Sequence, residues 1–266
     1  MPQKEPPTPV PSSTVLVLRD GDGPVPLEVF MVVRHHQIDF ASGALVFPGG
    51  KADASDFDPD WKNHVRDADE FDDYSLGIRV AAIREAFEES GILLARNPDC
   101  EDLIDAKQLA SYDKQRDALN ARELDFLDFI RTEGLKLASH QMQPFAHWIT
   151  PKMMPKRFDT HFFLAAWPEG QVGVHDGSES VDSVWISPRQ AIKEAEDGKR
   201  TIIFPTLMNL EMLAQSETVA DAFAAARERT IVTVEPKLVD RDGTKMLSIP
   251  AEAGYSVTER PIDQMA

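Results

Sequence analysis

The stretch that decides the fold of this chain reads Arg84-Glu85-Ala86-Phe87-Glu88-Glu89-Ser90-Gly91-Ile92. It lies in a longer run of good helix formers without proline, so we expect a helix. Glu85, Glu88 and Glu89 follow i, i+3, i+4 spacing, which directs their carboxylates from one helix face. Arg84 lies one turn before Glu88 and can orient it, and Gly91 is placed to end the helix.

Three carboxylates in one small volume repel each other. Oxygen-rich clusters of this kind suit a hard divalent cation such as Mg²⁺ or Mn²⁺, whose charge turns the repulsion into coordination. A solvated acidic helix is the alternative, because most glutamate runs on helices have that role. The upstream turn Phe47-Pro48-Gly49-Gly50-Lys51 favours a metal site, since two adjacent glycines let a ligand approach the main chain closely.

Together, these two segments resemble the Nudix hydrolase family. The stretch 84–92 is similar to the second half of the Nudix box, and 47–51 is similar to the strand and turn that open it. The resemblance implies that Glu85, Glu88 and Glu89 bind metal ions that act on a diphosphate, with Arg84 beside them as a catalytic residue. It also implies that the carbonyl of Gly49 is a metal ligand.

The chain departs from the family pattern between the glycines and the helix. The usual box has a glutamate six residues after the second glycine and the Arg-Glu pair eight residues beyond it, whereas here 33 residues lie between Gly50 and Arg84. Counting back eight residues from Arg84 reaches Leu76, which cannot replace a glutamate. We expect an acidic residue of the intervening segment to pair with Arg84, and the sequence leaves four candidates open. These are Asp69, Glu70, Asp72 and Asp73.

A long insertion at this point resembles a subgroup of the family that includes the coenzyme A diphosphatases of animal mitochondria and peroxisomes. The segment 150–164 resembles this subgroup too, since a Thr-Pro turn leads into Arg-Phe-Asp-Thr and an aromatic strand. The resemblance implies hydrolysis of coenzyme A or acyl-CoA to 3',5'-ADP and (acyl)phosphopantetheine. A diphosphatase acting on NADH, ADP-ribose or another dinucleotide is the alternative enzyme. A non-catalytic nucleotide-binding regulator and a purely structural partner protein are the alternative functions.

Four basic residues are candidates for contacts with the substrate phosphates. Arg34 ends an expected strand, Lys51 directly follows the glycine pair, and Lys152 and Arg157 belong to a basic stretch between two expected strands. A basic hairpin loop beside a core strand is an equally good interpretation of Lys152.

One loop acid is a candidate for the general base. Many Nudix enzymes use an acidic residue in the loop before the strand 181–186, and Glu179 occupies that position by its spacing to Trp185. Asp182 is the substitute, and a loop acid without a catalytic role is the alternative.

Alternating strands and helices around one catalytic helix predict an α/β sandwich with a mixed sheet, and the resemblance implies the Nudix-type α/β/α form. We expect a disordered, proline-rich lead-in over 1–12 and a single domain over 13–266. That domain carries insertions at about 52–76 and 99–140, the second of them helical, and a C-terminal extension of helices and a hairpin. The hairpin is expected between 230–234 and 246–249, around Asp242-Gly243.

Composition limits the partners and the location. The net charge of −17 over 266 residues argues against non-specific nucleic-acid binding, and a diphosphate needs metal ions and a local basic patch to approach. The single cysteine, Cys100, excludes an intramolecular disulfide. No apolar run approaches the roughly 18 to 20 residues of a membrane span, and the start lacks a signal-peptide pattern, so we expect a cytoplasmic protein without membrane partners. A homodimer is left open.

Overall fold

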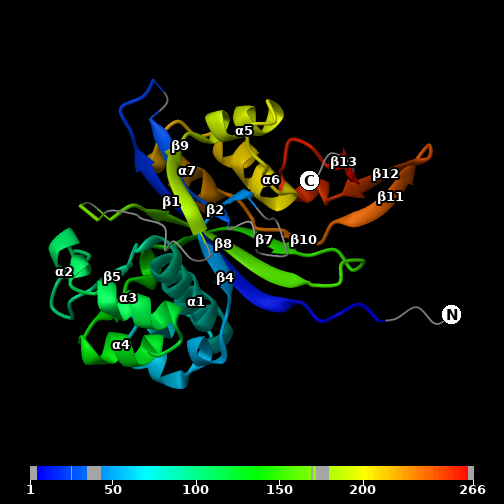
Figure 1. Cartoon of the computed structure of the whole chain (residues 1–266). Helices are drawn as coiled ribbons and strands as arrows, with labels where there is room; N and C mark the ends of the chain where they lie inside the picture. The colour runs from blue at the N-terminus through cyan, green and yellow to red at the C-terminus, as the bar shows by residue number, and fades with distance from the viewer. Residues whose placement is uncertain (1–4, 25, 35–42, 169, 172–179, 263–266) are drawn as a thin grey trace.

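A computed structural model describes residues 5–24, 26–34, 43–168, 170–171 and 180–262. It consists of a mixed β-sheet between two groups of helices, the predicted α/β/α sandwich (Figure 1). The helices of one group are α1 (Asp73–Ser90), α2 (Ala106–Ala110), α3 (Asp113–Asn120) and α4 (Phe126–Thr132). Those of the other are α5 (Pro188–Glu196), α6 (Phe204–Leu213) and α7 (Val219–Glu228).

The main sheet has the strand order β10-β7-β8-β1-β2-β3, with β4 paired to β1 and β9 paired to β2. Its strands are β1 (Val10–Asp20), β2 (Leu27–Arg34), β3 (Leu45–Val46), β4 (Gly49–Lys51), β7 (Gln143–Ile149), β8 (Phe158–Ala166), β9 (Ser180–Ile186) and β10 (Thr233–Val234). The pairs β1–β8 and β7–β10 are parallel, and the other described pairs of this sheet are antiparallel. The sheet is therefore mixed, as the sequence predicts.

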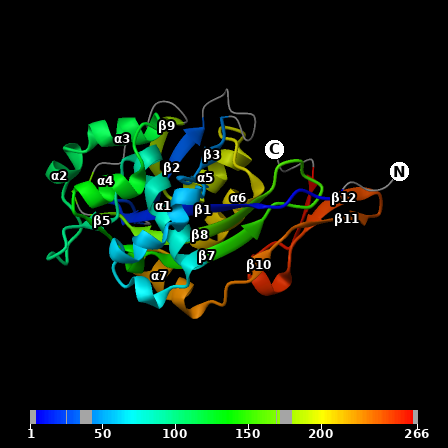
Figure 2. The same cartoon turned by 90° about the horizontal axis from the view of Figure 1, so that it is seen from below.

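The central strand β1 separates two hydrophobic cores. Val15 and Val17 pack into the core shared with α1, whereas Leu16 and Leu18 pack into the core under α5, α6 and α7. Successive side chains of a strand point to opposite faces, so a strand between two helix layers needs an apolar residue at each position. Figure 2 shows α1 lying along the sheet on the first of these faces.

Helix α1 has a defined start and end. Its N-cap Asp72 accepts a hydrogen bond from the backbone N–H of Ser75, and Gly91 ends the helix in the left-handed conformation at φ 69°. Gly91 thus ends the helix as expected. The start at Asp73 means that the last residues of the predicted first insertion, 73–76, belong to the helix.

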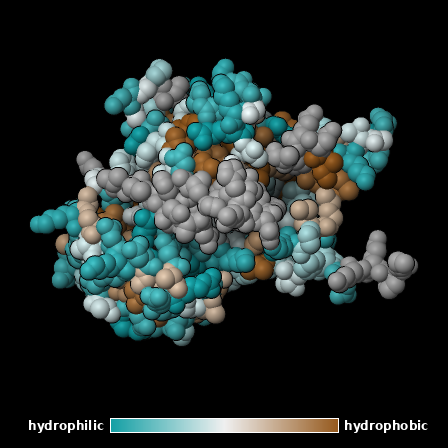
Figure 3. All heavy atoms as spheres, in the orientation of Figure 1, coloured by the Kyte–Doolittle hydropathy of each residue, from teal (hydrophilic) through white to brown (hydrophobic). Residues whose placement is uncertain are grey.

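Short elements surround this framework. The 3₁₀ helices are η1 (Ala54–Phe57), η2 (Pro59–Asn63), η3 (Ala68–Glu70), η4 (Ser139–Gln141) and η5 (Ala251–Ala253). The remaining strands are β5 (Ala95–Arg96), β6 (Lys136–Leu137), β11 (Lys237–Arg241), β12 (Thr244–Ser248) and β13 (Glu259–Pro261). Hydrophilic side chains cover most of the visible surface over α1 to α4 (Figure 3). None of the helices in the described part is long and apolar enough to cross a bilayer.

Two expected boundaries differ in the structure. Strand β1 begins at Val10, inside the predicted lead-in, because its first residues pair with the start of β8. The predicted hairpin around Asp242-Gly243 is formed by β11 and β12, not by the segment 230–234. The latter contains β10, which pairs in parallel with β7. The prediction missed β11 because its residues are mostly polar and exposed.

Candidate active site

Arg84 is the centre of a buried network of carboxylates on α1. Its Nε and Nη2 donate to the two carboxylate oxygens of Asp56, both at 2.9 Å. Its Nη1 donates to Glu85 Oε1 at 2.9 Å and to Glu88 Oε2 at 2.8 Å. Nη2 also donates to the backbone carbonyl of Lys51 at 2.9 Å. One guanidinium therefore fixes three acidic side chains and the end of β4.

The partner of Arg84 differs from the sequence prediction. Asp69, Glu70, Asp72 and Asp73 were the expected candidates, and this prediction was wrong. All four are exposed, whereas the side chain of Asp56 is 1% exposed and makes a two-pronged contact with the guanidinium. Counting forward six residues from Gly50 would have found Asp56, which is where the family pattern has its glutamate. The extra residues therefore lie between Asp56 and Arg84.

A local turn positions Asp56. The short helix η1 has a capping box, in which the carboxylate of Asp56 accepts from the backbone N–H of Asp53 at 2.7 Å. The other donors to this carboxylate come from Arg84, so its oxygens are satisfied although it is buried.

The helix and the double-glycine turn are in contact. The backbone N–H of Gly49 donates to Glu89 Oε2 at 2.8 Å. A Cβ added to Gly50 would lie 2.4 Å from Glu85 Oε2, so only glycine leaves room for this carboxylate. Pairing of Gly50 with Ser13 of β1 fixes the turn against the sheet. Glu85 and Glu89 thus lie against the turn, and Glu88 is joined to Glu85 through Arg84 Nη1.

The electrostatics of the network favour a bound cation. Burial raises the pKa of Glu85 to about 7 and also raises the pKa of Glu88, although the charge of Arg84 opposes both shifts. Burial alone would lower the pKa of Arg84, but its bond to Asp56 and the charges of the glutamates raise it overall. Arg84 places one positive charge against the carboxylates of Asp56, Glu85 and Glu88. Their oxygens are the donors that Mg²⁺ and Mn²⁺ prefer, so divalent ions fit the site.

The helical segment 99–140 reaches the same helix from its C-terminal end. Arg116 Nε and Asn120 Nδ2 of α3 donate to the backbone carbonyl of Glu88 at 3.0 and 3.3 Å. Glu88 lies within the last four residues of α1, whose carbonyls have no partner inside the helix. The segment therefore caps the helix, a role that its sequence did not reveal because the contact joins residues about 30 positions apart.

Arg157 lies in a structural network, not in the glutamate cluster. Its Nε donates to the carbonyl of Thr150 at 3.0 Å, its Nη1 to the carbonyl of Pro7 at 2.8 Å, and its Nη2 to Glu235 Oε1 at 2.5 Å. The residue is 7% exposed. These contacts join the start of the chain, the β7–β8 turn and the segment after β10, and they argue against the expected phosphate contact.

The remaining predicted site residues have no described side-chain contact with the Arg84 network. Lys51 is exposed at the end of β4 and contributes its carbonyl, and Lys152 is exposed in the connection between β7 and β8. Arg34 ends β2, but its side chain and the whole of Glu179 lie outside the described residues. Their roles stay predictions.

Asp182, the substitute base, lies at a separate cavity. The cavity measures about 300 Å³ and is lined by Asp182, Val33, Leu45, Lys199 and four further residues. None of the three glutamates of α1 lines it. This position gives no support to Asp182 as a base at the glutamate cluster.

A glutamate-rich helix packed on a mixed sheet, with its carboxylates against a double-glycine turn, defines a Nudix-type protein. A solved Nudix hydrolase from Alicyclobacillus acidocaldarius has the same fold, with a TM-score of 0.65 and 27% identity over 82% of this chain and 96% of that one. The chain belongs to the NUDT19 Nudix domain family, whose model matches residues 67–213, more than half of its length.

Curated relatives carry the same name. The acyl-coenzyme A diphosphatase NUDT19 of Xenopus laevis is 25% identical over 225 residues, and that of Homo sapiens is 26% identical over 244 residues. These matches include 70% and 74% of this chain. They span only 59% and 64% of the relatives, so the chain covers less than two thirds of either protein.

Proposed function

We propose that the protein is a metal-dependent diphosphatase that hydrolyses coenzyme A or an acyl-coenzyme A to 3',5'-ADP and phosphopantetheine or its acyl form. The observation that carries this proposal is that Glu85 and Glu89 lie against the double-glycine turn while Arg84 joins Glu85 to Glu88. The printed names of the frog and human relatives support the substrate class.

Mg²⁺ or Mn²⁺ is the proposed cofactor, held by the three glutamates and by the carbonyl of Gly49. A hard divalent ion in this position supplies charge neutralisation for the diphosphate and lowers the pKa of a bound water. The raised pKa values of Glu85 and Glu88 support the assignment, because buried carboxylates without enough countercharge gain most from a cation.

The residues of the chain orient these ligands in advance. Arg84 Nη1 holds one oxygen each of Glu85 and Glu88, while Asp56 occupies the opposite edge of the guanidinium. The N–H of Gly49 holds Glu89. Such preorganisation lowers the reorganisation needed in the transition state. We propose that Glu179 accepts a proton from the attacking water. The water oxygen bonds to one phosphorus of the diphosphate while the bond from that phosphorus to the bridging oxygen breaks.

Contacts with the substrate phosphates are proposed for Arg34, Lys51 and Lys152. Exposed lysines have free rotation to meet a phosphate, which supports Lys51 and Lys152. Arg157 is omitted from this set because three backbone or carboxylate acceptors already bind its guanidinium.

A substrate panel tests the proposal. Purified protein is incubated with coenzyme A, acetyl-coenzyme A, NADH and ADP-ribose, each with Mg²⁺ or Mn²⁺, and products are identified by mass spectrometry. We expect 3',5'-ADP and a phosphopantetheine from the first two substrates. Much faster cleavage of ADP-ribose or NADH would replace the proposal with a dinucleotide diphosphatase. Nucleotide binding without turnover of any substrate would favour a regulator.

Location and assembly remain part of the proposal. We propose a cytoplasmic protein, and fractionation of cells that produce it would test this. For assembly, light scattering coupled to size exclusion would decide between a monomer and the homodimer that the sequence leaves open.

A further inference from the structure

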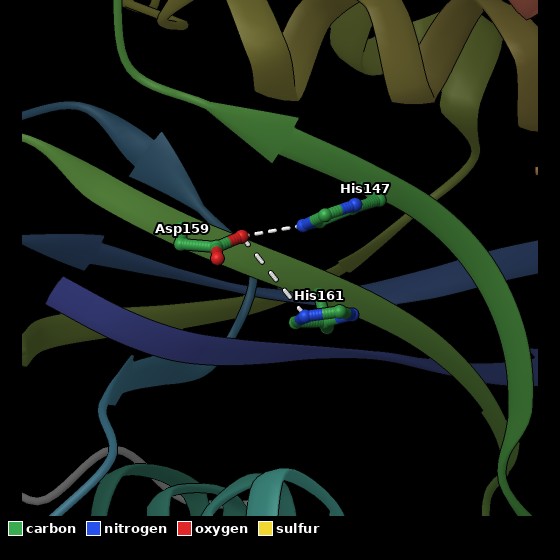
Figure 4. Close-up of side chains that lie close together, drawn as sticks. All are labelled: His147, Asp159 and His161. Atoms are coloured by element: carbon green, nitrogen blue, oxygen red, sulfur yellow. Dashed lines mark hydrogen bonds and ion pairs between the residues drawn. The ribbon is translucent and has the colours of Figure 1, made fainter. Parts of the chain in front are cut away.

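A group of three side chains of metal-ligating types lies on the main sheet, outside the glutamate cluster. His147 of β7 pairs directly with His161 of β8, and Asp159 is two residues before His161. Residues two apart on a strand point to the same face, and cross-strand neighbours on that face meet. Figure 4 shows the three side chains directed toward one another from the two strands.

The ligand atoms of this group share one small volume. One ring nitrogen or carboxylate oxygen from each residue lies within 4.8 Å of the others. His147 Nε2 contacts Asp159 Oδ1, and His161 Nε2 lies 4.0 Å from the same oxygen. Ligands of a tetrahedral zinc ion, bound at about 2.0–2.1 Å, lie about 3.3 Å from one another. His147 and Asp159 would therefore separate, and His161 would approach, as the three atoms close around one ion.

The hydrogen bonds of the group occupy both nitrogens of His147 and leave one nitrogen of His161 without a partner among the described residues. His147 Nδ1 lies 2.8 Å from Thr233 Oγ1 of β10, a contact that orients the ring from behind. Metal-binding histidines commonly use their second nitrogen in this way. His161 Nε2 is buried and has no hydrogen-bond partner among the described residues. Such a nitrogen is unusual in a folded protein and points to a missing ligand.

The three side chains are partly exposed, by 19%, 26% and 28% for His147, Asp159 and His161, whereas the Nε2 atom of His161 is itself buried. The group therefore lies at the edge of the protein interior.

We infer that His147, Asp159 and His161 form a second metal site, selective for a transition-metal ion of the Zn²⁺ class. Two imidazoles and one carboxylate suit Zn²⁺ and related ions, whereas Mg²⁺ prefers oxygen ligands alone. Three protein ligands leave a fourth position for water or an anionic oxygen. The ion joins β7 to β8, and Thr233 extends the connection to β10.

The site lies beside the glutamate cluster on the same face of the sheet. In the register of the sheet, His161 is paired with Ser13 of β1, and Ser13 is paired with Gly50 of β4. Two strand spacings place Gly50 about 10 Å from His161. The ring of Tyr74, near the start of α1, contacts His161 with a centroid distance of 5.9 Å. The two groups are therefore neighbours that differ in ligand chemistry.

Metal titration tests the inference without reference to catalysis. Chelator-treated full-length protein is titrated with Zn²⁺ by calorimetry in excess Mg²⁺, and Co²⁺ is added separately to record visible absorption. We expect one Zn²⁺ per chain and Co²⁺ bands of a four-coordinate site. In His147→Ala and His161→Ala the affinity should fall by more than the roughly 10- to 100-fold that loss of an outer-shell partner causes.

Matched variants locate the ion. His140→Ala removes an exposed histidine outside the group, and Glu88→Gln changes the glutamate cluster, so both should keep the Zn²⁺ affinity and the Co²⁺ spectrum. Circular dichroism of the metal-free proteins checks folding, and Asp159→Asn replaces any alanine variant that fails to fold. Unchanged Zn²⁺ affinity in the histidine variants, loss of binding in Glu88→Gln, or no stoichiometric binding by the parent protein would overturn the inference.

Discussion

The two segments that flank α1 in the sequence hold this helix in different ways. The acidic segment (52–72) places one buried carboxylate, Asp56, against Arg84 in the middle of the helix. The helical segment (99–140) binds the last turn through Arg116 and Asn120. Glu88 joins the two arrangements, because Arg84 binds its side chain and α3 binds its carbonyl. The acidic segment is thus linked to Glu88 indirectly, through Arg84, and the helical segment binds it directly by capping.

The two segments both contact α1, but the kind of contact decides how much each one stabilises the helix. Removal of one partner from a buried ion pair leaves an uncompensated charge and costs about 3–5 kcal/mol. Loss of a hydrogen bond to one helix carbonyl, which water can replace, costs about 1 kcal/mol. Variants in the two segments should therefore differ in how much they lower the free energy of unfolding. Variants at Glu88 and at the double-glycine turn should instead change activity more than stability.

The largest loss of activity is expected at the glutamates Glu88 and Glu89. Glu88→Gln and Glu89→Gln should fold normally and lose on the order of 10²–10³ in kcat, since each removes a charged ligand while keeping the side-chain shape. Turnover and thermal unfolding are measured together, with Glu196→Gln at the exposed end of α5 as the control. Near-parental turnover in either variant would refute the metal assignment.

The second prediction compares the stability contribution of Asp56 with that of Asp69, one of the acids expected from the sequence. Asp56→Asn should lower the free energy of unfolding by about 3 kcal/mol, because the guanidinium of Arg84 stays buried with less countercharge. Asp69→Asn, in the same segment but exposed, should change it by less than about 0.5 kcal/mol. Urea unfolding of both variants gives the comparison. Equal changes in the free energy of unfolding would mean that the Asp56–Arg84 pair stabilises the protein no more than an exposed charge does.

The third prediction concerns the turn that leads into the acidic segment. Gly50→Ala should reduce kcat by about tenfold with little loss of stability, because the new methyl group displaces the carboxylate of Glu85 from its position. Gly243→Ala is the opposite control. Its left-handed φ of 85° should cost about 1–2 kcal/mol of stability and leave kcat unchanged, since no atom lies near the added methyl. A kcat for Gly50→Ala equal to that of the parent would show that Glu85 relocates freely.

The smallest effect is expected in the helical segment. Arg116→Ala should cost about 1 kcal/mol of stability and change kcat less than Gly50→Ala does, because the carbonyl of Glu88 keeps Asn120 as a donor. Lys114→Ala removes an exposed charge from the same helix and should be close to neutral. Chemical unfolding and steady-state kinetics measure both. A loss of turnover in Arg116→Ala as large as in Glu88→Gln would show that this segment takes part in the chemistry.

Local spacing was sufficient to predict the helix, its glutamate face and its end. These features depend on backbone geometry over a few residues, so Glu85, Glu88, Glu89 and Gly91 could be read directly from the sequence. The alternating strands and the sandwich followed from the same kind of pattern. The position of Asp56 was also available from a forward count after Gly50, although the backward count from Arg84 missed it.

Contacts between distant segments were decided only by the tertiary structure. Pairing of β10 with β7, the three acceptors of Arg157 and the meeting of His147 with Asp159 join residues between 7 and 150 positions apart. Such contacts depend on which strands pair and in which register, and no short-range periodicity encodes this choice. The sequence by itself therefore determined the chemistry of α1, and the packing of the sheet and of the two flanking segments determined which other side chains surround it.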